Sequence, residues 1–222
     1  YNDVGEFTCS SSCTEVKEFD ISGTPPDVDT TLSGVVRKLL LIQSQGRREG
    51  GYARGRLHSK NLYKAKFGNE RVFTRTVNKS MLDVSVSLIC DCSGSMSGRK
   101  YRCAMAATLS LHHALSSNNI PMEVVGFTWH SNPIHYLFSQ FGQRTPTSTV
   151  GERMASSSID MSGNSDGESL LYCYNRIKAQ QTKRKVMIVL SDGSPAAHGG
   201  DCYTFTKNVV GQIEGSGVEV YG

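Results

Sequence analysis

Residues 89–98 read ICDCSGSMSG and follow a largely apolar run that begins at Val84. A short apolar run of this kind is typical of a buried strand in a parallel sheet. Asp91, Ser93 and Ser95 then come at alternate positions, and two glycines allow the chain to turn sharply after them. One carboxylate and two hydroxyls that converge on a point are the small oxygen ligands that suit Mg²⁺ or Mn²⁺. The segment therefore predicts a divalent-cation site just outside a buried strand.

From Leu82 onward, segments with strand and helix patterns alternate along the chain. This alternation indicates an α/β fold with a doubly wound, mostly parallel sheet. We expect a domain over residues 81–222 and, before it, an N-terminal basic, partly helical extension over residues 1–80. Strands are expected at 84–90, 122–127, 186–190 and 218–221, with a short antiparallel strand at 134–138. Helices are expected at 100–116, 167–179 and 203–213, and a loop at 139–166.

Finer expectations follow from the same patterns. The strand at 186–190 is nearly pure Val, Ile, Met and Leu, which predicts burial of both its faces. The helix at 100–116 would turn inward Cys103, Ala106, Ala107, Leu111 and Leu115. Before the domain we expect an irregular segment at 1–30, a helix at 30–45, an extended linker at 46–56, a short helix at 57–67 and a short strand at 72–74.

A second acidic residue, Asp192, directly follows the expected strand at 186–190. In open α/β sheets, ligands gather at the carboxyl ends of the strands. Asp91 and Asp192 would repel each other at such an edge, and a divalent cation removes that repulsion. The alternative for Asp192 is a turn residue before Gly193, a position where Asp is common.

The Asp91-x-Ser93-x-Ser95 pattern resembles the metal-ion-dependent adhesion site of von Willebrand factor A (VWA) domains. The resemblance implies a further ligand from a loop threonine before a later helix. Here Asn164 stands near that place, and no threonine does. Asn164 and Asp166 are therefore the candidates for additional oxygen ligands. The alternative for Asp166 is a cap on the helix that follows it.

Several short motifs narrow the resemblance to the CobT-type subunits of aerobic cobaltochelatase, over about residues 50–222. The motifs are Gly55-Arg56-Leu57, Phe67-Gly68, Arg71-Val72-Phe73, Ser95-Met96-Ser97-Gly98-Arg99, Asn164-x-Asp166-Gly167-Glu168 and Ser191-Asp192-Gly193-Ser194-Pro195. The resemblance implies a cytoplasmic, non-catalytic subunit that works with a MoxR/CobS-type AAA+ ATPase and a large chelatase subunit in cobalamin synthesis. It also implies that the VWA domain continues beyond Gly222. The alternative is an adaptor for an AAA+ machine with another client.

The resemblance also implies that the bound cation leaves one coordination position open for a carboxylate of the partner. Met96, Ser194 and His198 are the residues that we expect on the docking rim. His198 is the nearest candidate base, but a lone loop histidine does not make a catalytic site. The cobalt that the complex inserts is cargo and differs from the ion expected at Asp91.

The net charge of +4 conceals a strongly basic stretch. Residues 37–79 hold twelve Lys or Arg and only two acids, whereas the rest of the chain is mildly acidic. Arg47, Arg48, Arg54 and Arg56 alternate with glycines and Tyr52, so nucleic acid is a rival partner for this basic arm. The simpler interpretation is that the arm docks on an acidic partner surface or wraps around its own domain.

Cysteine usage and hydropathy argue against a secreted or membrane protein. The seven cysteines are an odd number, and we interpret Cys90, Cys103 and Cys173 as small core residues. Cys9 and Cys13 lack a matching second pair for a zinc site. No stretch approaches the roughly 20 apolar residues of a transmembrane helix. An extracellular adhesion domain is thus the third and weakest class.

Overall fold

The computed structural model describes residues 13–31, 47–54, 56–57, 67–68, 71–77, 83–193 and 202–222. The chain divides into two compact units. The larger contains residues 1–36 and 83–222, and the smaller runs from Arg37 to Leu82. Among the described residues, no helix is long and apolar enough to cross a membrane.

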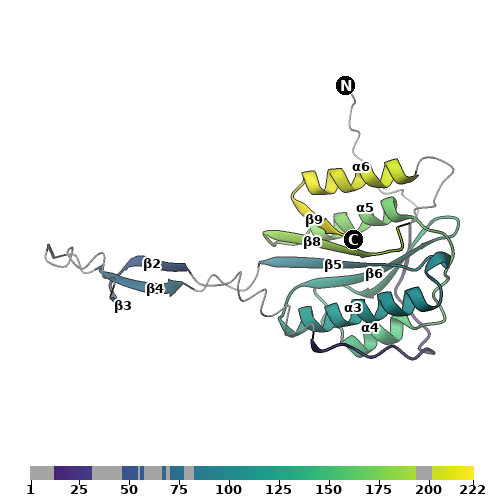
Figure 1. Cartoon of the computed structure of the whole chain (residues 1–222), viewed down its shortest axis with the longest axis horizontal. Coiled ribbons are helices and arrows are strands. Elements are labelled where there is room, and N and C mark those ends of the chain that lie inside the picture. Colours follow the sequence, from purple (N-terminus) through teal and green to yellow (C-terminus); the bar gives the residue numbers. More distant parts are fainter. Residues whose placement is uncertain are drawn as a thin grey trace, which may run out of the picture. The chain divides into compact units, whose positions relative to one another are not determined.

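A six-stranded sheet forms the centre of the larger unit (Figure 1). Its strands, in the order in which they pair, are β1 (Thr14–Val16), β7 (Pro133–Ser139), β6 (Met122–Trp129), β5 (Val84–Asp91), β8 (Arg184–Leu190) and β9 (Val218–Tyr221). Only β6 and β7 run antiparallel, and every other neighbouring pair is parallel. The predicted α/β fold with a mostly parallel sheet is therefore confirmed, and so is the antiparallel strand expected at 134–138.

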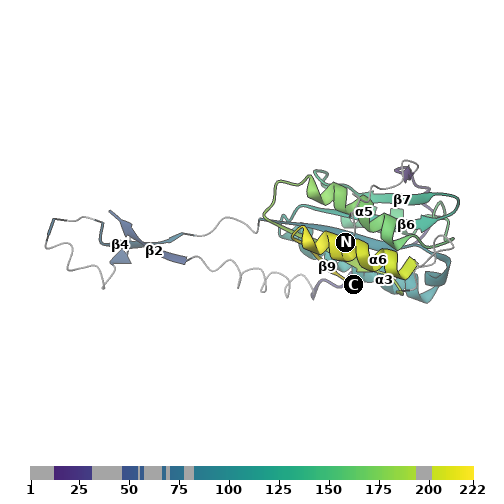
Figure 2. The same cartoon turned by 90° about the horizontal axis from the view of Figure 1, so that it is seen from above.

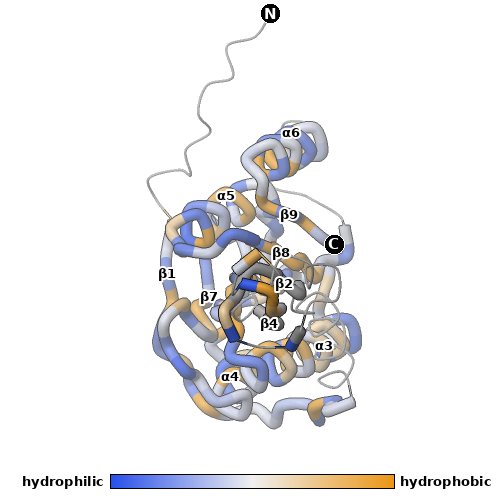
Figure 3. The backbone as a smooth tube through the Cα atoms, turned by 90° about the vertical axis from the view of Figure 1, so that its left-hand side faces the viewer, coloured by the Kyte–Doolittle hydropathy of each residue, from blue (hydrophilic) through white to orange (hydrophobic). Residues whose placement is uncertain are grey.

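Helices cover both faces of this sheet (Figure 1). The helices α5 (Asp166–Lys178) and α6 (Cys202–Gly215) lie on one face. On the other face lie α3 (Arg99–Ser117) and the short α4 (Thr147–Met154). Seen from above, α5 and α6 run side by side across the strands (Figure 2). The end-on view shows hydrophobic segments of the sheet between the two helical layers (Figure 3).

Three local expectations are wrong, and packing explains each. The stretch 139–166 contains α4, whose Val150 and Met154 are buried. Only Val186 and Met187 of β8 are buried, because α3 packs mainly over β5 and β6 rather than over β8. The inward face of α3 is rotated from the predicted one, so Cys103 and Ala107 are exposed. Larger side chains occupy the inward positions instead, namely Tyr101, Met105 and Leu109.

Residues 13–31 form an N-terminal strap along the larger unit, almost wholly within the segment 1–30 that we expected to be irregular. Strand β1 pairs with the edge strand β7. Phe19 then packs against Phe138 in a tilted arrangement, with ring centroids 5.4 Å apart. The backbone N–H of Asp29 donates to Ser110 Oγ at 3.0 Å on α3. The strap therefore belongs to the sheet domain, although we expected that domain to begin only at residue 81.

The smaller unit contains a three-stranded antiparallel sheet in the order β2-β4-β3. Its strands are β2 (Arg47–Tyr52), β3 (Arg56–Leu57) and β4 (Phe73–Val77). In the described part of the expected linker 46–56, β2 and Arg56 are extended and are paired into this sheet. Strand β4 confirms the expected strand near residues 72–74. The helices expected at 30–45 and 57–67 lie almost wholly outside the described residues.

Candidate metal centre

Asp91 ends the fully buried strand β5, and its side chain is inaccessible to solvent. The backbone N–H of Cys92 donates to the carbonyl of Phe127 on β6 at 2.8 Å, which holds the chain as it leaves the sheet. A single 3₁₀ turn, Gly94–Met96, follows directly. Sheet pairing before Asp91 and the tight turn after it place the acid at the carboxyl edge of the sheet.

The two predicted serines lie beside Asp91. The backbone N–H of Ser93 donates to Asp91 Oδ1 at 2.8 Å. The hydroxyls of Ser93 and Ser95 are 3.0 Å apart. The structure therefore places the two hydroxyls side by side, and the backbone of Ser93 holds the Asp91 carboxylate.

Asn164 approaches the other oxygen of Asp91 from a distant loop. Its Nδ2 donates to Asp91 Oδ2 at 3.3 Å, and its side chain is almost completely buried. Reciprocal backbone hydrogen bonds between Gly163 and Trp129 hold this loop against the end of β6. Asn164 was expected near the site from its place before α5, and the structure places it there.

Asp166 is the first residue of α5 and is also buried. Burial, followed by the negative charge of Asp91, raises the pKa of its carboxyl to about 6. Its Oδ2 is buried without a hydrogen-bond partner among the described residues. The alternative role as a helix cap does not hold, because Ser165 is the N-cap residue and no side-chain cap bond forms. A buried acid beside a second acid is the arrangement that a cation would stabilise.

Ser191, which directly follows β8, is a site residue that sequence reasoning missed. Its hydroxyl donates to Asp91 Oδ2 at 2.9 Å and also lies 3.4 Å from Asp166 Oδ1. It therefore links the two acids. Its position before Asp192, at the carboxyl end of a strand, is the signal that could have identified it.

Asp192 lies at the same edge of the sheet, because β5 and β8 pair in parallel with Cys90 opposite Leu190. Its Oδ2 forms an ion pair with Lys100 Nζ at 3.0 Å, at the start of α3. Lys100 thus offsets the negative charge of Asp192 in this structure. No group of three His, Cys, Asp or Glu side chains in the described part of the chain is arranged to hold a metal ion. Hydroxyl and amide groups would have to complete any coordination here.

A family model agrees with this geometry. The model of the Cobalamin biosynthesis protein CobT VWA domain matches residues 72–145. That stretch includes Asp91, Ser93 and Ser95 together with the strands and helix around them. Over these residues, about a third of its length, the chain is similar to the CobT VWA domain. Asn164, Asp166 and Ser191 lie beyond the matched residues, so their place in the site rests on the structure.

The solved structure of a pilus adhesin has a similar fold. The chain resembles the pilus adhesin SpaC from Lactobacillus rhamnosus GG in its open conformation, with a TM-score of 0.51 and 16% identity. The match covers 64% of this chain and 24% of the adhesin, so the chain spans about a quarter of that protein. The PilB minor pilin from Streptococcus sanguinis matches with a TM-score of 0.46 and 17% identity, over 66% of this chain and 51% of the pilin. At these identities the likeness concerns the fold alone.

The expected docking rim of the VWA domain needs one correction. Met96 is buried, with 4% of its surface exposed, so its side chain faces the core rather than a partner. Its place at the end of the 3₁₀ turn, next to α3, explains this burial. Ser194 and His198 lie outside the described residues.

The basic arm is only partly described. Arg47 and Arg48 belong to β2, and Arg56 belongs to β3. Arg54 and Arg56 are exposed to solvent. Exposed arginines on a small sheet are compatible with an acidic protein surface or with nucleic acid as the partner.

Proposed function

We propose that the VWA domain binds Mg²⁺ or Mn²⁺ and uses the ion to dock a partner protein. Asp91, Ser93 and Ser95 would hold the cation, and Asn164, Asp166 and Asp192 are the candidates that complete its surroundings. The supporting observation is the buried pair Asp91 and Asp166, in which one carboxylate oxygen of Asp166 has no described partner. A bound divalent ion would neutralise the negative charge of these two acids. It would also offer an open coordination position to a carboxylate from the partner.

Side chains and backbone around Asp91 hold its carboxylate in one orientation, as a cation site requires. Hydrogen bonds from Ser93, Asn164 and Ser191 orient the Asp91 carboxylate and limit its rotation. Preorganised ligands of this kind raise metal affinity, because less conformational freedom is lost on binding. In our proposal a carboxylate from the partner completes the coordination, so docking requires the ion.

We further propose a role related to cobaltochelatase. The match to the CobT VWA domain supports this assignment. The chain would act as a non-catalytic cytoplasmic subunit that couples a MoxR/CobS-type AAA+ ATPase to a large chelatase subunit. Cobalt is then the cargo of the complex. An adaptor of an AAA+ machine with another client would use the same docking chemistry.

Cation binding is tested first, by calorimetric titration of the purified chain with MgCl₂ and MnCl₂. We expect Asp91→Asn to abolish measurable binding. Asp83→Asn is the matched control, because Asp83 is an exposed acid next to the opposite end of β5. Equal affinity of Asp91→Asn and the unchanged chain would remove the metal site from the proposal.

Docking is tested separately, by pull-down of a CobS-type AAA+ ATPase. We expect retention in Mg²⁺, loss in EDTA, and loss with Asp91→Asn but not with Asp83→Asn. Retention that survives both EDTA and Asp91→Asn would reject metal-dependent docking. Cation binding without any ATPase retention would favour an adaptor with another partner.

A further inference from the structure

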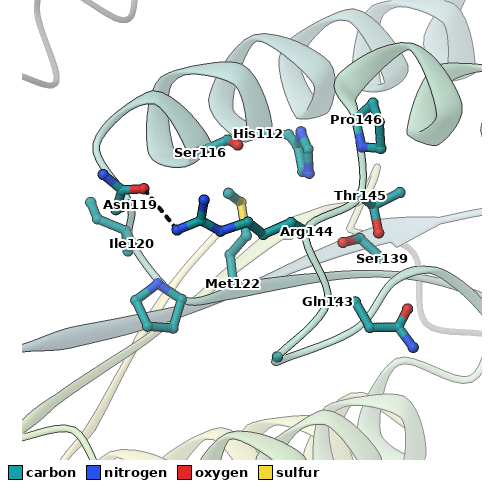
Figure 4. A pocket seen from close by; sticks show the side chains of 12 residues that line it. His112, Ser116, Asn119, Ile120, Met122, Ser139, Gln143, Arg144, Thr145 and Pro146 are labelled. Carbon is teal, nitrogen blue, oxygen red and sulfur yellow. Dashed lines mark hydrogen bonds between the residues drawn. The ribbon is translucent and has the colours of Figure 1, made fainter.

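Figure 4 shows a cavity in the larger unit. It lies at the end of the sheet opposite to Asp91. Its volume is about 400 Å³, within the range of small-molecule sites. The end of α3, the start of β6, the end of β7 and the loop before α4 surround it. The register confirms this location, because Ser139 at the end of β7 pairs with Val124 near the start of β6. The cavity is therefore separate from the candidate metal centre.

Arg144 is the only charged side chain among the residues that line the cavity. Its Nη2 reaches Asn119 Oδ1 at 3.5 Å, a long contact with a neutral amide (Figure 4). No ion pair joins Arg144 to an acid in the described part of the chain. The lining contains neither Asp nor Glu. Its guanidinium, a planar fork of donors, is thus available to an anion from outside.

His112 supplies a second polar group from α3. The side chain is almost completely buried, and its Nδ1 lies 3.0 Å from Thr147 Oγ1. No other hydrogen bond joins this ring to the described residues. Burial, and to a lesser extent the neighbouring His113, lowers the pKa of His112 to about 4, so the ring is neutral at pH 7. The cavity then carries a single positive charge.

The other walls combine apolar and neutral polar groups. Ile120, Pro121, Met122 and Pro146 offer apolar surface, while Ser116, Ser139, Gln143 and Thr145 offer neutral hydrogen-bonding groups. Such a lining suits an organic molecule with an apolar body and one polar end.

We propose that this cavity binds a small organic monocarboxylate, with the carboxylate on Arg144 and the apolar body against Ile120 and Met122. Arg–carboxylate pairs form two parallel hydrogen bonds, and the single charge of Arg144 matches one carboxylate. A phosphate dianion would leave one negative charge uncompensated beside neutral His112. The site is independent of the cation proposed at Asp91.

Sodium benzoate is a suitable probe, added to the full chain at pH 7 and followed by amide NMR shifts. We expect saturable shifts at the cavity residues and none at the Asp91 edge. Benzamide, which has the same shape without the charge, should bind at least about tenfold more weakly, because it loses the charge-assisted hydrogen bonds. Arg144→Gln should weaken benzoate binding to a similar extent. Arg102→Gln, at an exposed arginine of α3 outside the cavity, is the matched control.

The imidazole signals of His112 give a second readout. Benzoate should raise the pKa of His112 in the unchanged chain and in Arg102→Gln, but not in Arg144→Gln. The absence of saturable shifts, or equal affinity for benzoate and benzamide, would overturn the proposal. Unchanged benzoate affinity in Arg144→Gln would also overturn it. Displacement of benzoate by an equal concentration of inorganic phosphate would reject the carboxylate assignment in favour of a general anion site.

Discussion

The hydroxyl of Ser191 donates to Asp91 Oδ2 at 2.9 Å, although the two residues are 100 positions apart in the chain. The parallel pairing of β5 with β8 produces this contact, because it aligns the carboxyl ends of the two strands. Ser191 therefore orients the acid on which the proposed cation site depends.

The first prediction concerns this hydrogen bond. Ser191→Ala should lower Mg²⁺ affinity by about tenfold, because partners that orient metal ligands contribute on this scale. Calorimetric titration measures the change. Ser117→Ala, at an exposed serine at the end of α3, serves as the control. Unaltered Mg²⁺ affinity in Ser191→Ala would show that Asp91 needs no support from β8.

A second prediction concerns Lys100, which is 60% exposed and forms an ion pair with the much less exposed Asp192. Lys100→Met removes the positive charge that competes with a cation for Asp192. We therefore expect tighter Mn²⁺ binding. The affinity should rise only a few-fold, because an exposed ion pair contributes about 1 kcal/mol or less. The control is Lys183→Met, at an exposed lysine outside the site. Weaker Mn²⁺ binding in Lys100→Met would mean that Lys100 supports the site.

A third prediction concerns the ion pair between Glu123 and Arg176, with Nε and Oε2 2.8 Å apart. Glu123 is fully buried on β6, accepts a hydrogen bond from Ser87, and has its pKa raised by burial. Arg176→Met should lower the free energy of unfolding by about 3 kcal/mol at pH 8, because the buried carboxylate loses its partner. Urea denaturation measures this loss.

The double variant of this pair provides the decisive comparison. Glu123→Leu combined with Arg176→Met should recover most of the lost stability, since no buried charge remains.

A second ion pair serves as the control. Arg184→Met breaks the partly exposed pair with Glu219 and should lower the free energy of unfolding by about 1 kcal/mol or less. If Arg176→Met costs no more than Arg184→Met, the buried pair does not behave as proposed.

The fourth prediction is a loss of stability at mildly acidic pH. Burial lowers the pKa of His112 and of His135 to about 4. His135 stacks on Tyr172 with ring centroids 3.9 Å apart, and its Nε2 lies 3.2 Å from Ser169 Oγ. An unfolded histidine titrates near pH 6.5, so the unfolded state binds more protons between about pH 6.5 and 4. Each histidine should therefore cost about 2 kcal/mol of stability between pH 7 and 5.

Urea denaturation across this pH range tests the histidine prediction. His135→Phe should reduce the loss of stability between pH 7 and 5 by about 2 kcal/mol, because the contribution of this buried histidine is then absent. His130→Gln, at an exposed histidine, should leave the pH dependence unchanged. A pH dependence that is the same in His135→Phe and the unchanged chain would assign the effect to other groups.

The local part of the candidate site could be predicted from the sequence. Asp91, Ser93 and Ser95 lie within five residues, so strand geometry and one tight turn are sufficient to bring them together. The order of strands and helices also follows from local patterns of apolar residues. The inward face of α3 was less predictable, because alanine and cysteine fit either environment.

The sequence by itself determined the alternating α/β order and the Asp-x-Ser-x-Ser segment, because both depend on residues that are close in the chain. Only the tertiary structure decided that Ser191 contacts Asp91, that Lys100 pairs with Asp192, and that residues 13–31 lie along the sheet domain. These contacts join segments about 90 or more residues apart. Their partners are chosen by strand pairing and by the burial of side chains, which no local pattern specifies.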